Sequence, residues 1–547
     1  GPDGEGCYAD GTAALGHRRL SVIDLAGGGQ PMLNEDGTLV VVFNGEIYNY
    51  KTLRARLQQR GHTFATDSDT EVLLHGYEEW GRDLPCRLRG MFAFALWDRR
   101  AGVLFCARDM FGIKPLYYCR CADGTLLFAS EIKAFLDHPS FAKRLNTAQL
   151  PLYLSCQYSP GRDTFFCRRA EAAARAFSRV LRRHRPHDAV GAACLPARRR
   201  AGLPCRDRRS PARQCGGAQG RRRRGRGVPV GRRGLGLPDR AGPAPRAPTR
   251  SATPSRSTTS PSPPGRWRAA SACETACGAS APASSGTPCP PYSTTWTSRW
   301  PTLPPWRSTF LNREAAKDVK VVLSGEGADE LFGGYNIYRD PFTARWYDRL
   351  PPWLRAGLGA AAALLPPARG VNFLVRRGMS LEERYFGPTA LFNEREKRRL
   401  LADYAGDGDP MFLTEAIWDA TEGLDPVTRM QQVDLNLWLA GDILLKADKM
   451  SMAHSLELRV PFLDREVWAL AAALPAAAKA DARTTKIALR RAAARTLPAA
   501  SAARKKLGFP VPVRDWLRQE PYTSRVRAVF SARQRRSSLT RARCIVC

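Results

Sequence analysis

The stretch that most constrains the fold is residues 319–335, Val-Lys-Val-Val-Leu-Ser-Gly-Glu-Gly-Ala-Asp-Glu-Leu-Phe-Gly-Gly-Tyr. A short β-branched run stops at Ser324 and Gly325, and an acidic and apolar segment follows. This pattern predicts a strand, a tight loop and a helix. Loops at the strand ends of parallel sheets face ligands, and glycine lets backbone N–H groups approach an anion closely. The loop is therefore a candidate phosphate site.

Two acidic side chains distinguish this loop from an ordinary phosphate loop. Glu326 can accept a proton or orient an amine, and Asp329 can hold Mg²⁺. The alternative is a plain strand-to-helix turn, because glycine-rich turns are common. The rest of the chain decides between these interpretations.

The length of 547 residues predicts two or more domains, each with its own core. No apolar run reaches the length of a membrane span, and the chain does not start with a signal peptide. We therefore expect a cytoplasmic protein without a membrane partner.

The net charge of +34 is unevenly distributed. Residues 167–309 hold 29 arginines, no lysine and five acidic residues, and so contribute +24 of it. The same block holds seven of the fifteen cysteines, but it lacks the ligand pairs and histidines at the spacing of a zinc site. The flanking segments have the mixed charge of an ordinary enzyme.

Residues 1–155 alternate short apolar strands with turns, which indicates a β-rich sandwich with polar residues at strand ends. Its motifs are Gly-His-Arg-Arg-Leu-Ser-Val-Ile-Asp (16–24), Val-Val-Val-Phe-Asn-Gly-Glu-Ile-Tyr-Asn (40–49), Asp-Ser-Asp-Thr-Glu-Val (67–72) and Gly-Met-Phe-Ala-Phe-Ala-Leu-Trp-Asp (90–98). Together they resemble the glutaminase domain of class II amidotransferases. That resemblance implies an α+β N-terminal-nucleophile fold, a sandwich of two stacked sheets flanked by helices.

The resemblance also assigns a glutamine site. Arg19 would pair with the α-carboxylate of glutamine, for which its bidentate fork is suited. Asp69 would take the α-amino group, Asn44 and Gly45 would form the oxyanion hole, and Glu46 would complete the pocket. Taken singly, Arg19 and Asp69 would be interpreted as solvated surface charges.

The nucleophile of this family is an N-terminal cysteine whose α-amine serves as the base. The start of this chain, Gly-Pro-Asp-Gly, matches a motif several dozen residues downstream of that cysteine. Cys7 has no terminal amine, and we assign it no catalytic role. We expect the chain to be truncated at its N-terminus and, as printed, not to hydrolyse glutamine by that mechanism.

The second half has the signatures of another domain. Residues 324–335, 445–464 and 484–490 resemble the synthetase domain of glutamine-dependent asparagine synthetases. The resemblance implies an α/β ATP-pyrophosphatase-type domain over residues 310–530, followed by an uncertain tail at 531–547. ATP and Mg²⁺ would be its cofactors. The implied roles are ATP binding by Ser324 and Gly325, Mg²⁺ binding by Asp329, phosphate neutralisation by Lys486, and adenylate formation and ammonia deprotonation by Glu326.

Several residues near this loop receive structural interpretations. The apolar spacing of residues 428–452 predicts buried helices. The dense charges at Glu457, Arg459 and Asp464 are typical of a buried ion-pair network. His454 receives no role, and Asp448 is either structural or part of an aspartate site.

Residues 163–309 fit neither domain, and the family's Ser-Gly-Gly-Val-Asp-Ser-Ser loop is absent from this interval. A one-base shift in the frame of residues 228–236 permits Phe-Leu-Ser-Gly-Gly-Val-Asp-Ser, and family-like runs also become possible near residues 170–178 and 294–309. We interpret the block as translated out of frame, hence non-native or disordered. A real basic insert that binds RNA is the alternative.

The predicted activity is ATP-dependent conversion of aspartate to asparagine with glutamine as nitrogen donor, through a β-aspartyl-adenylate and transferred ammonia. Small molecules are the expected partners, with no nucleic acid, and a homodimer is possible. Two alternatives stay open. One is an amidotransferase of the same fold that acts on another acceptor, in antibiotic or polysaccharide pathways, and the other is a non-catalytic protein with a basic nucleic-acid-binding insert. With both the nucleophile and the pyrophosphatase loop missing, the literal chain is predicted to be inactive.

Overall fold

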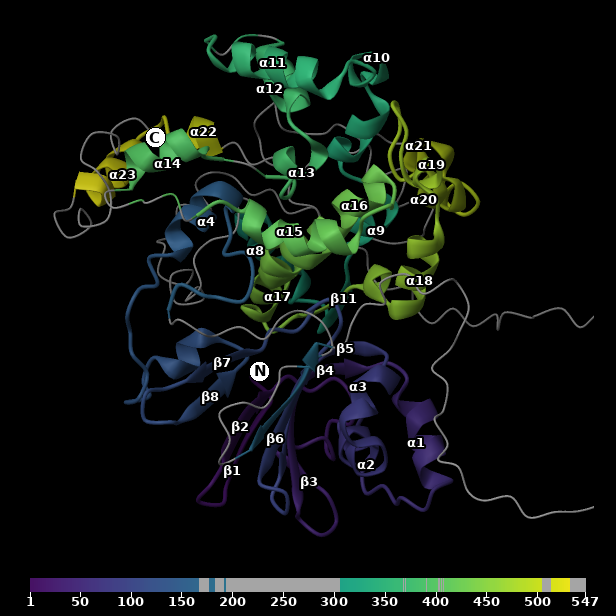
Figure 1. Cartoon of the computed structure of the whole chain (residues 1–547). Coiled ribbons are helices and arrows are strands. Elements are labelled where there is room, and N and C mark those ends of the chain that lie inside the picture. The colour runs from purple at the N-terminus through teal and green to yellow at the C-terminus, as the bar shows by residue number, and fades with distance from the viewer. Residues whose placement is uncertain are drawn as a thin grey trace, which may run out of the picture.

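The computed structural model describes four segments of the chain. These are residues 1–166, 177–182, 191–192 and 305–531, the last without 367, 369, 390, 402, 403, 405, 407 and 504–512. The proposed out-of-frame origin of residues 163–309 therefore falls mostly outside the described residues, as does the tail at 532–547. In Figure 1 the described N-terminal residues form a β-rich domain below a largely helical C-terminal domain.

A six-stranded sheet forms the centre of the N-terminal domain, with the strand order β10-β9-β6-β5-β4-β3 and antiparallel pairing throughout. β4 and β5 pair over their full length, from Leu39 opposite Asp98 to Ile47 opposite Gly90. The strands are β3 (Met32–Leu33), β4 (Leu39–Ile47), β5 (Gly90–Asp98), β6 (Val103–Arg108), β9 (Phe177–Arg182) and β10 (Gly191–Ala192). β9 pairs with β6, although its residues lie inside the arginine-rich block.

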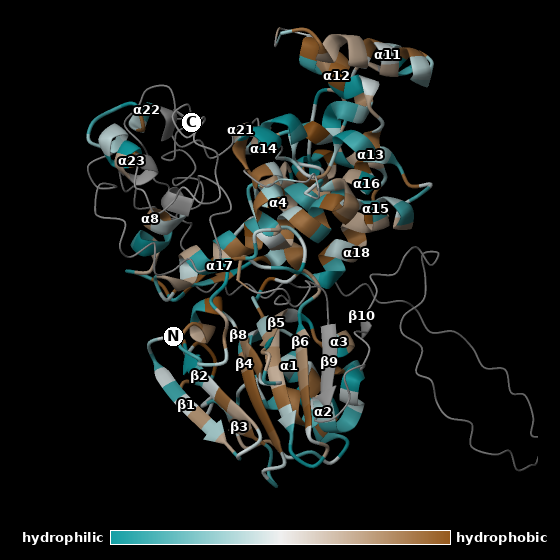
Figure 2. Cartoon of the chain, turned by 60° about the vertical axis from the view of Figure 1, so that its left-hand side comes forward, coloured by the Kyte–Doolittle hydropathy of each residue, from teal (hydrophilic) through white to brown (hydrophobic). Residues whose placement is uncertain are grey.

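The two faces of this sheet enter different cores because successive side chains of a strand point in opposite directions. Val41 and Phe43 of β4 join the core beneath helices α1 (Tyr50–Gln58) and α2 (Glu71–Trp80). Val40 and Val42 join the opposite core. That core also holds residues of the hairpins β1 (Gly4–Ala9) with β2 (Ala14–Arg19) and β7 (Tyr117–Arg120) with β8 (Leu126–Ala129). Figure 2 shows the hydrophobic residues along β4 and β5. The described part of the N-terminal domain is thus an α+β layered fold, as predicted, but two hairpins lie where a second continuous sheet was expected.

The C-terminal domain contains one short parallel pair within its described part, β11 (Val321–Leu323) with β12 (Glu457–Arg459). Helices surround it, and α11 and α12 lie farthest from the N-terminal domain (Figure 1). Nowhere in the described segments does a helix combine the length and apolarity needed to cross a bilayer. The helices from this half of the chain are α8 (Pro305–Ala315), α9 (Ala328–Phe332), α10 (Arg345–Asp348), α11 (Pro352–Ala363), α12 (Val371–Gly378), α13 (Leu381–Arg384), α14 (Glu394–Leu400), α15 (Met411–Ala420), α16 (Pro426–Val433), α17 (Leu445–Met452), α18 (Arg465–Ala473), α19 (Ala476–Lys479), α20 (Ile487–Ala493), α21 (Ala499–Ala502), α22 (Val513–Trp516) and α23 (Tyr522–Ser531).

The two domains share a hydrophobic core. Met91 and Phe111 of the N-terminal domain belong to the same buried cluster as Phe332, Leu444 and Leu463 of the C-terminal domain. Burial of apolar surface from both sides stabilises their contact. Sites on the two domains are therefore held in a defined relation to each other.

The buried helices predicted over residues 428–452 are present, but their middle is π-helical. α16 continues into η4 (Asp434–Leu444), a π-helical segment, and then into α17. Asp434 at the start of η4 is fully buried, and its Oδ2 accepts hydrogen bonds from the hydroxyls of Tyr338 and Tyr385. Burial raises the pKa of Asp434 to about 8, against the opposing effect of these hydroxyls. The carboxyl group therefore stays protonated near neutral pH.

Asp434→Asn tests this assignment, because asparagine is the neutral isostere of a protonated aspartate. A folded-state pKa above the ordinary 3.8 makes the parent lose stability as the pH rises from about 4 to about 8, since the unfolded chain releases a proton that the folded chain retains. We expect this group to lower the free energy of unfolding of the parent by up to ~1.4 kcal/mol per pH unit. Asp434→Asn should lack this pH dependence. Urea midpoints measured at several pH values between about 5 and 8 check this.

Asp419→Asn, at an exposed position of α15, is the matched control and should follow the parent. Parallel pH profiles for the parent and Asp434→Asn would contradict the assignment of a protonated Asp434.

Candidate functional site

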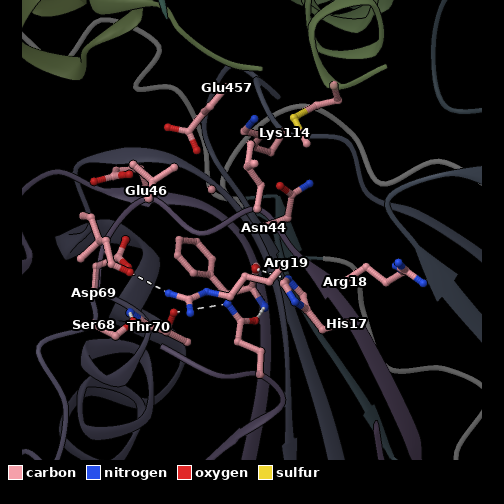
Figure 3. Close-up of a pocket in the computed structure, with 17 residues that line it drawn as sticks. His17, Arg18, Arg19, Asn44, Glu46, Ser68, Asp69, Thr70, Lys114 and Glu457 are labelled. Atoms are coloured by element: carbon pink, nitrogen blue, oxygen red, sulfur yellow. Dashed lines mark hydrogen bonds between the residues drawn. The ribbon is translucent and has the colours of Figure 1, made fainter. Parts of the chain in front are cut away.

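A pocket at the end of the N-terminal sheet holds all five residues predicted to bind glutamine. Its lining comprises His17, Arg18, Arg19, Leu20, Val22, Ile23, Gln30, Phe43, Asn44, Gly45, Glu46, Ser68, Asp69, Thr70, Lys114, Met452 and Glu457. β2 brings Arg19, β4 brings Asn44, Gly45 and Glu46, and the segment before α2 brings Asp69. Figure 3 shows their labelled side chains around the same space. Met452 and Glu457 extend the pocket wall into the C-terminal domain.

The guanidinium of Arg19 is fixed by the backbone of the loop that follows β2. Its Nη2 donates to the carbonyls of Ile23 and Asp24, both at 2.7 Å, and its Nη1 donates to Leu25 at 3.3 Å. All three acceptors are neutral carbonyl groups, so they orient the guanidinium without neutralising its charge. The pocket therefore offers a preorganised cation to an anionic ligand.

Gly45 is the one position of β4 where a side chain does not fit. Its φ is +145°, and a Cβ atom would collide with the carbonyl oxygen of Met91 on β5. Glycine is required here because L-residues with a side chain avoid this conformation. Gly45 lies between Asn44 and Glu46 on β4, and all three residues line the pocket.

Two carboxyl groups in the pocket have raised pKa values. Burial raises the pKa of Asp69 to about 6, although its Oδ2 accepts a hydrogen bond of 2.9 Å from the backbone N–H of Ile47. Burial likewise raises the pKa of Glu46 to about 7, opposed by the charge of Arg459. A ligand cation that reaches these carboxylates would restore their ordinary ionisation.

Arg459 ties this pocket to the second domain. From β12 its Nη2 donates to Glu46 at 2.5 Å and its Nε donates to Glu457 at 2.7 Å. The predicted ion pairs of Glu457, Arg459 and Asp464 are thus present, and Asp464 pairs with Arg89 of the N-terminal domain at 2.5 Å.

The sequence did not predict that Glu457 and Lys114 line the pocket. Glu457 and Arg459 lie two residues apart on β12 and therefore share one face of the strand, but no local pattern in the sequence indicates that this face reaches the pocket.

The loop after β11 has the predicted form of strand, turn and helix. The backbone N–H of Ser324 donates to the carbonyl of Arg459 at 2.8 Å, so β12 holds the start of the loop. Gly327 has a φ of +85° and packs against Leu463, and α9 follows directly. The half-buried Glu326 projects from this turn. Burial raises its pKa, Lys446 lowers it, and Asp329 and Asp442 raise it further.

Lys486 reaches the same loop from the start of α20. Its Nζ lies 3.1 Å from Asp329 Oδ1, and its backbone has a φ of +55°, which is uncommon for a residue with a side chain. Gly334 leaves room for this pair, because a Cβ there would collide with both side chains. The structure therefore brings Ser324, Gly325, Glu326, Asp329 and Lys486 into one neighbourhood.

The described residues thus form a pocket in the N-terminal domain and a glycine-containing loop in the C-terminal domain, and β12 contacts both. Residues 1–181 match the family model described as a glutamine amidotransferase domain, and residues 305–545 match the model described as asparagine synthase. Neither match includes residues 182–304. The class is that of a two-domain amidotransferase.

Two relatives align with nearly the whole chain. A Mycobacterium tuberculosis protein provisionally named an asparagine synthetase (glutamine-hydrolysing) is 41% identical over 549 residues, which span 95% of this chain and 83% of that protein. Asparagine synthetase (glutamine-hydrolysing) 1 of Bacillus subtilis is 38% identical over 533 residues, with the same two coverages. Among solved structures, the glutamine phosphoribosylpyrophosphate amidotransferase of B. subtilis matches 22% of this chain and 28% of its own at 27% identity, with a TM-score of 0.20. The chain belongs to the family of glutamine-hydrolysing asparagine synthetases.

A buried ion pair at the domain border gives a test of how the two halves are joined. Lys114 Nζ lies 3.0 Å from Asp448 Oδ1, and the lysine side chain is only 3% exposed. Burial alone would lower the pKa of Lys114, but Asp448 and Glu457 raise it. We expect Lys114→Met to cost ~3–5 kcal/mol of unfolding free energy, because it leaves Asp448 buried without its partner. Denaturant titration measures this cost.

Lys133→Met is the matched control, because Lys133 forms a pair of 2.9 Å with Glu131 but is 46% exposed. It should cost less than ~1 kcal/mol. The double variant Lys114→Met/Asp448→Leu should recover most of the loss. Equal costs for the two lysine variants would show that the border pair does not stabilise the joined domains.

Proposed function

We propose that the N-terminal pocket binds glutamine through the five residues named above and that the C-terminal loop serves the activation of aspartate by ATP. Arg19 takes the α-carboxylate of glutamine and Asp69 takes its α-amino group. The amide of Asn44 and the backbone N–H of Gly45 stabilise the charge that develops on the amide oxygen. The observation that carries the proposal is the placement of a fixed cation, two buried carboxyl groups and the positive-φ residue Gly45 around one cavity.

The second half-reaction makes asparagine from activated aspartate. An oxygen of the aspartate β-carboxylate bonds to the α-phosphorus of ATP, and the bond to pyrophosphate breaks. The nitrogen of ammonia then bonds to the acyl carbon, and AMP leaves. Glu326 accepts the proton that nitrogen releases, a role that a raised pKa favours because a carboxylate with a higher pKa is a stronger base.

Asp329 and Lys486 are the residues proposed to meet the phosphates. Mg²⁺ binds proteins through one or two carboxylates together with phosphate oxygens, and the side chain of Asp329 is 25% exposed. Mg²⁺ would supply charge neutralisation on the leaving pyrophosphate. Lys486 adds a second positive charge there, and the backbone of Ser324 and Gly325 approaches the nucleotide.

β12 supports the pairing of these two half-reactions in one chain. Its Glu457 side chain lines the glutamine pocket, and the carbonyl of Arg459 holds the first residue of the aspartate-activating loop. Transfer of ammonia between the sites, a homodimeric assembly and a cytoplasmic location stay predictions from the sequence analysis.

Asp69→Asn tests the glutamine site in the chain as it exists. We expect the variant to bind glutamine at least ~10-fold more weakly than the parent, because the α-ammonium loses a buried anionic partner. Isothermal titration of L-glutamine into the 1–547 chain measures the change. Asp67→Asn is the matched control, because Asp67 lies two residues away with a side chain that is 90% exposed. Unchanged affinity in Asp69→Asn would exclude this residue from the site.

Binding without turnover is the second expected result. No cysteine is found among the described residues that line the pocket, and Cys7 is exposed on β1. The Ser-Gly-Gly loop of the family is also absent from the printed sequence. We expect the purified 1–547 chain to form no asparagine from aspartate and ATP with either glutamine or ammonia, measured by amino-acid analysis and pyrophosphate release. Asparagine formation above the level of an enzyme-free control would disprove this.

A further inference from the structure

A cluster of two histidines and several glutamates lies beside α2, away from the glutamine pocket residues. His62 comes from the turn after α1, and His75 and Glu78 lie three residues apart on α2. One ligand atom from each of these three residues lies within 4.8 Å of the other two. We propose that His62, His75 and Glu78 bind a divalent transition-metal ion of the Zn²⁺ class. This proposal is independent of the function proposed above.

The distances suit tetrahedral coordination. Glu78 Oε2 lies 3.1 Å from His75 Nδ1 and 3.4 Å from His62 Nδ1. Ligand atoms about 2.0–2.1 Å from a tetrahedral zinc ion are separated from one another by about 3.3 Å. Two imidazoles and one carboxylate are a common ligand set for zinc, and water would take the fourth position. The side chains of His62 and Glu78 are 18% and 28% exposed, which gives the ion an entry path.

Each proposed ligand has a second partner behind it, as ligands of metal sites usually do. His75 Nε2 is buried without a hydrogen-bond partner, yet it lies 3.6 Å from Glu71 Oε1 and 3.8 Å from Glu35 Oε1. With a metal on Nδ1, the proton of His75 resides on Nε2 and faces these carboxylates. His62 Nε2 likewise lies 3.7 Å from a carboxylate oxygen of Glu79.

The carboxylate ligand is also oriented from behind. Asn34 Nδ2 donates to Glu78 Oε1 at 2.8 Å and leaves Oε2 directed at the histidines. Glu71 has a different role, because its two oxygens already accept hydrogen bonds from the backbone N–H groups of Ala65 and Thr66. It is therefore an outer partner and not a ligand.

The surrounding charge favours a cation. Carboxylates surround the two imidazoles: Glu71 and Glu35 face His75 Nε2, and Glu79 faces His62 Nε2. Their negative charges attract a divalent cation. A bound ion would cross-link the turn after α1 to α2, the helix that begins directly after Asp69 and Thr70 of the pocket.

The test compares metal binding by four forms of the full 1–547 chain after treatment with a chelator. The forms are the parent, His62→Gln, Glu78→Gln and the matched control His138→Gln, whose histidine lies outside the cluster and accepts a hydrogen bond from Ser140. These ligands are partly exposed, so their variants avoid the cavity that removal of the buried His75 would create. Zn²⁺ binding is measured by titration calorimetry, and Co²⁺ provides a visible absorption spectrum that reports tetrahedral geometry.

We expect His62→Gln and Glu78→Gln each to bind Zn²⁺ at least tenfold more weakly than the parent. Both variants should also lose the Co²⁺ absorption and the rise in melting temperature that one equivalent of Zn²⁺ causes. The parent and His138→Gln should retain all three. Cysteines elsewhere contribute the same background to every form. Equal stoichiometry and spectra in all four forms, or an equal loss in His138→Gln, would overturn the proposal.

Discussion

Arg459 makes the interaction on which the functional arrangement depends. It bridges Glu46 of the N-terminal sheet and Glu457 of its own strand, and its carbonyl holds Ser324. Charges at a domain border are expensive to bury unless they are paired. Because the partners of this one arginine come from both domains, correct docking is what satisfies them. The positions of both sites therefore depend on the contact between the two domains.

β12 contacts both sites because the side chains and the backbone of a strand point in different directions. Its side chains and its backbone groups point in perpendicular directions, so Glu457 can line the pocket while the backbone pairs with β11. A strand of only three residues therefore serves two sites. The apolar cluster around Met91 and Leu444 supplies the non-directional part of the same contact. Polar contacts then select one docking geometry from those that the apolar surfaces allow.

Much of this could be predicted from the sequence, because local pattern determines local structure. The β-branched run and the glycines around Glu326 predicted the strand, the turn and the helix that the structure shows, and the glutaminase motifs predicted a layered β-rich domain. Contacts between distant residues were not predictable in this way. Nothing in the spacing of Lys114 or Glu457 indicates that both reach the pocket, and apolar periodicity does not distinguish the π-helical η4 from an α-helix. The histidine cluster was missed for the same reason, although the i, i+3 spacing of His75 and Glu78 was a usable signal.

Close cations compensate the buried carboxyl groups of the pocket. Glu46 and Asp69 are poorly solvated, and only close cations can offset that cost, because interactions between exposed charges are screened beyond about 10 Å. Arg459 lies within hydrogen-bond distance of Glu46, and Lys114 lines the same cavity. These two cations therefore provide close positive charge for the carboxyl groups of the pocket. When an α-amino acid binds, its ammonium and carboxylate groups lie beside opposite charges that the fold has already placed. The charges in the pocket are then paired.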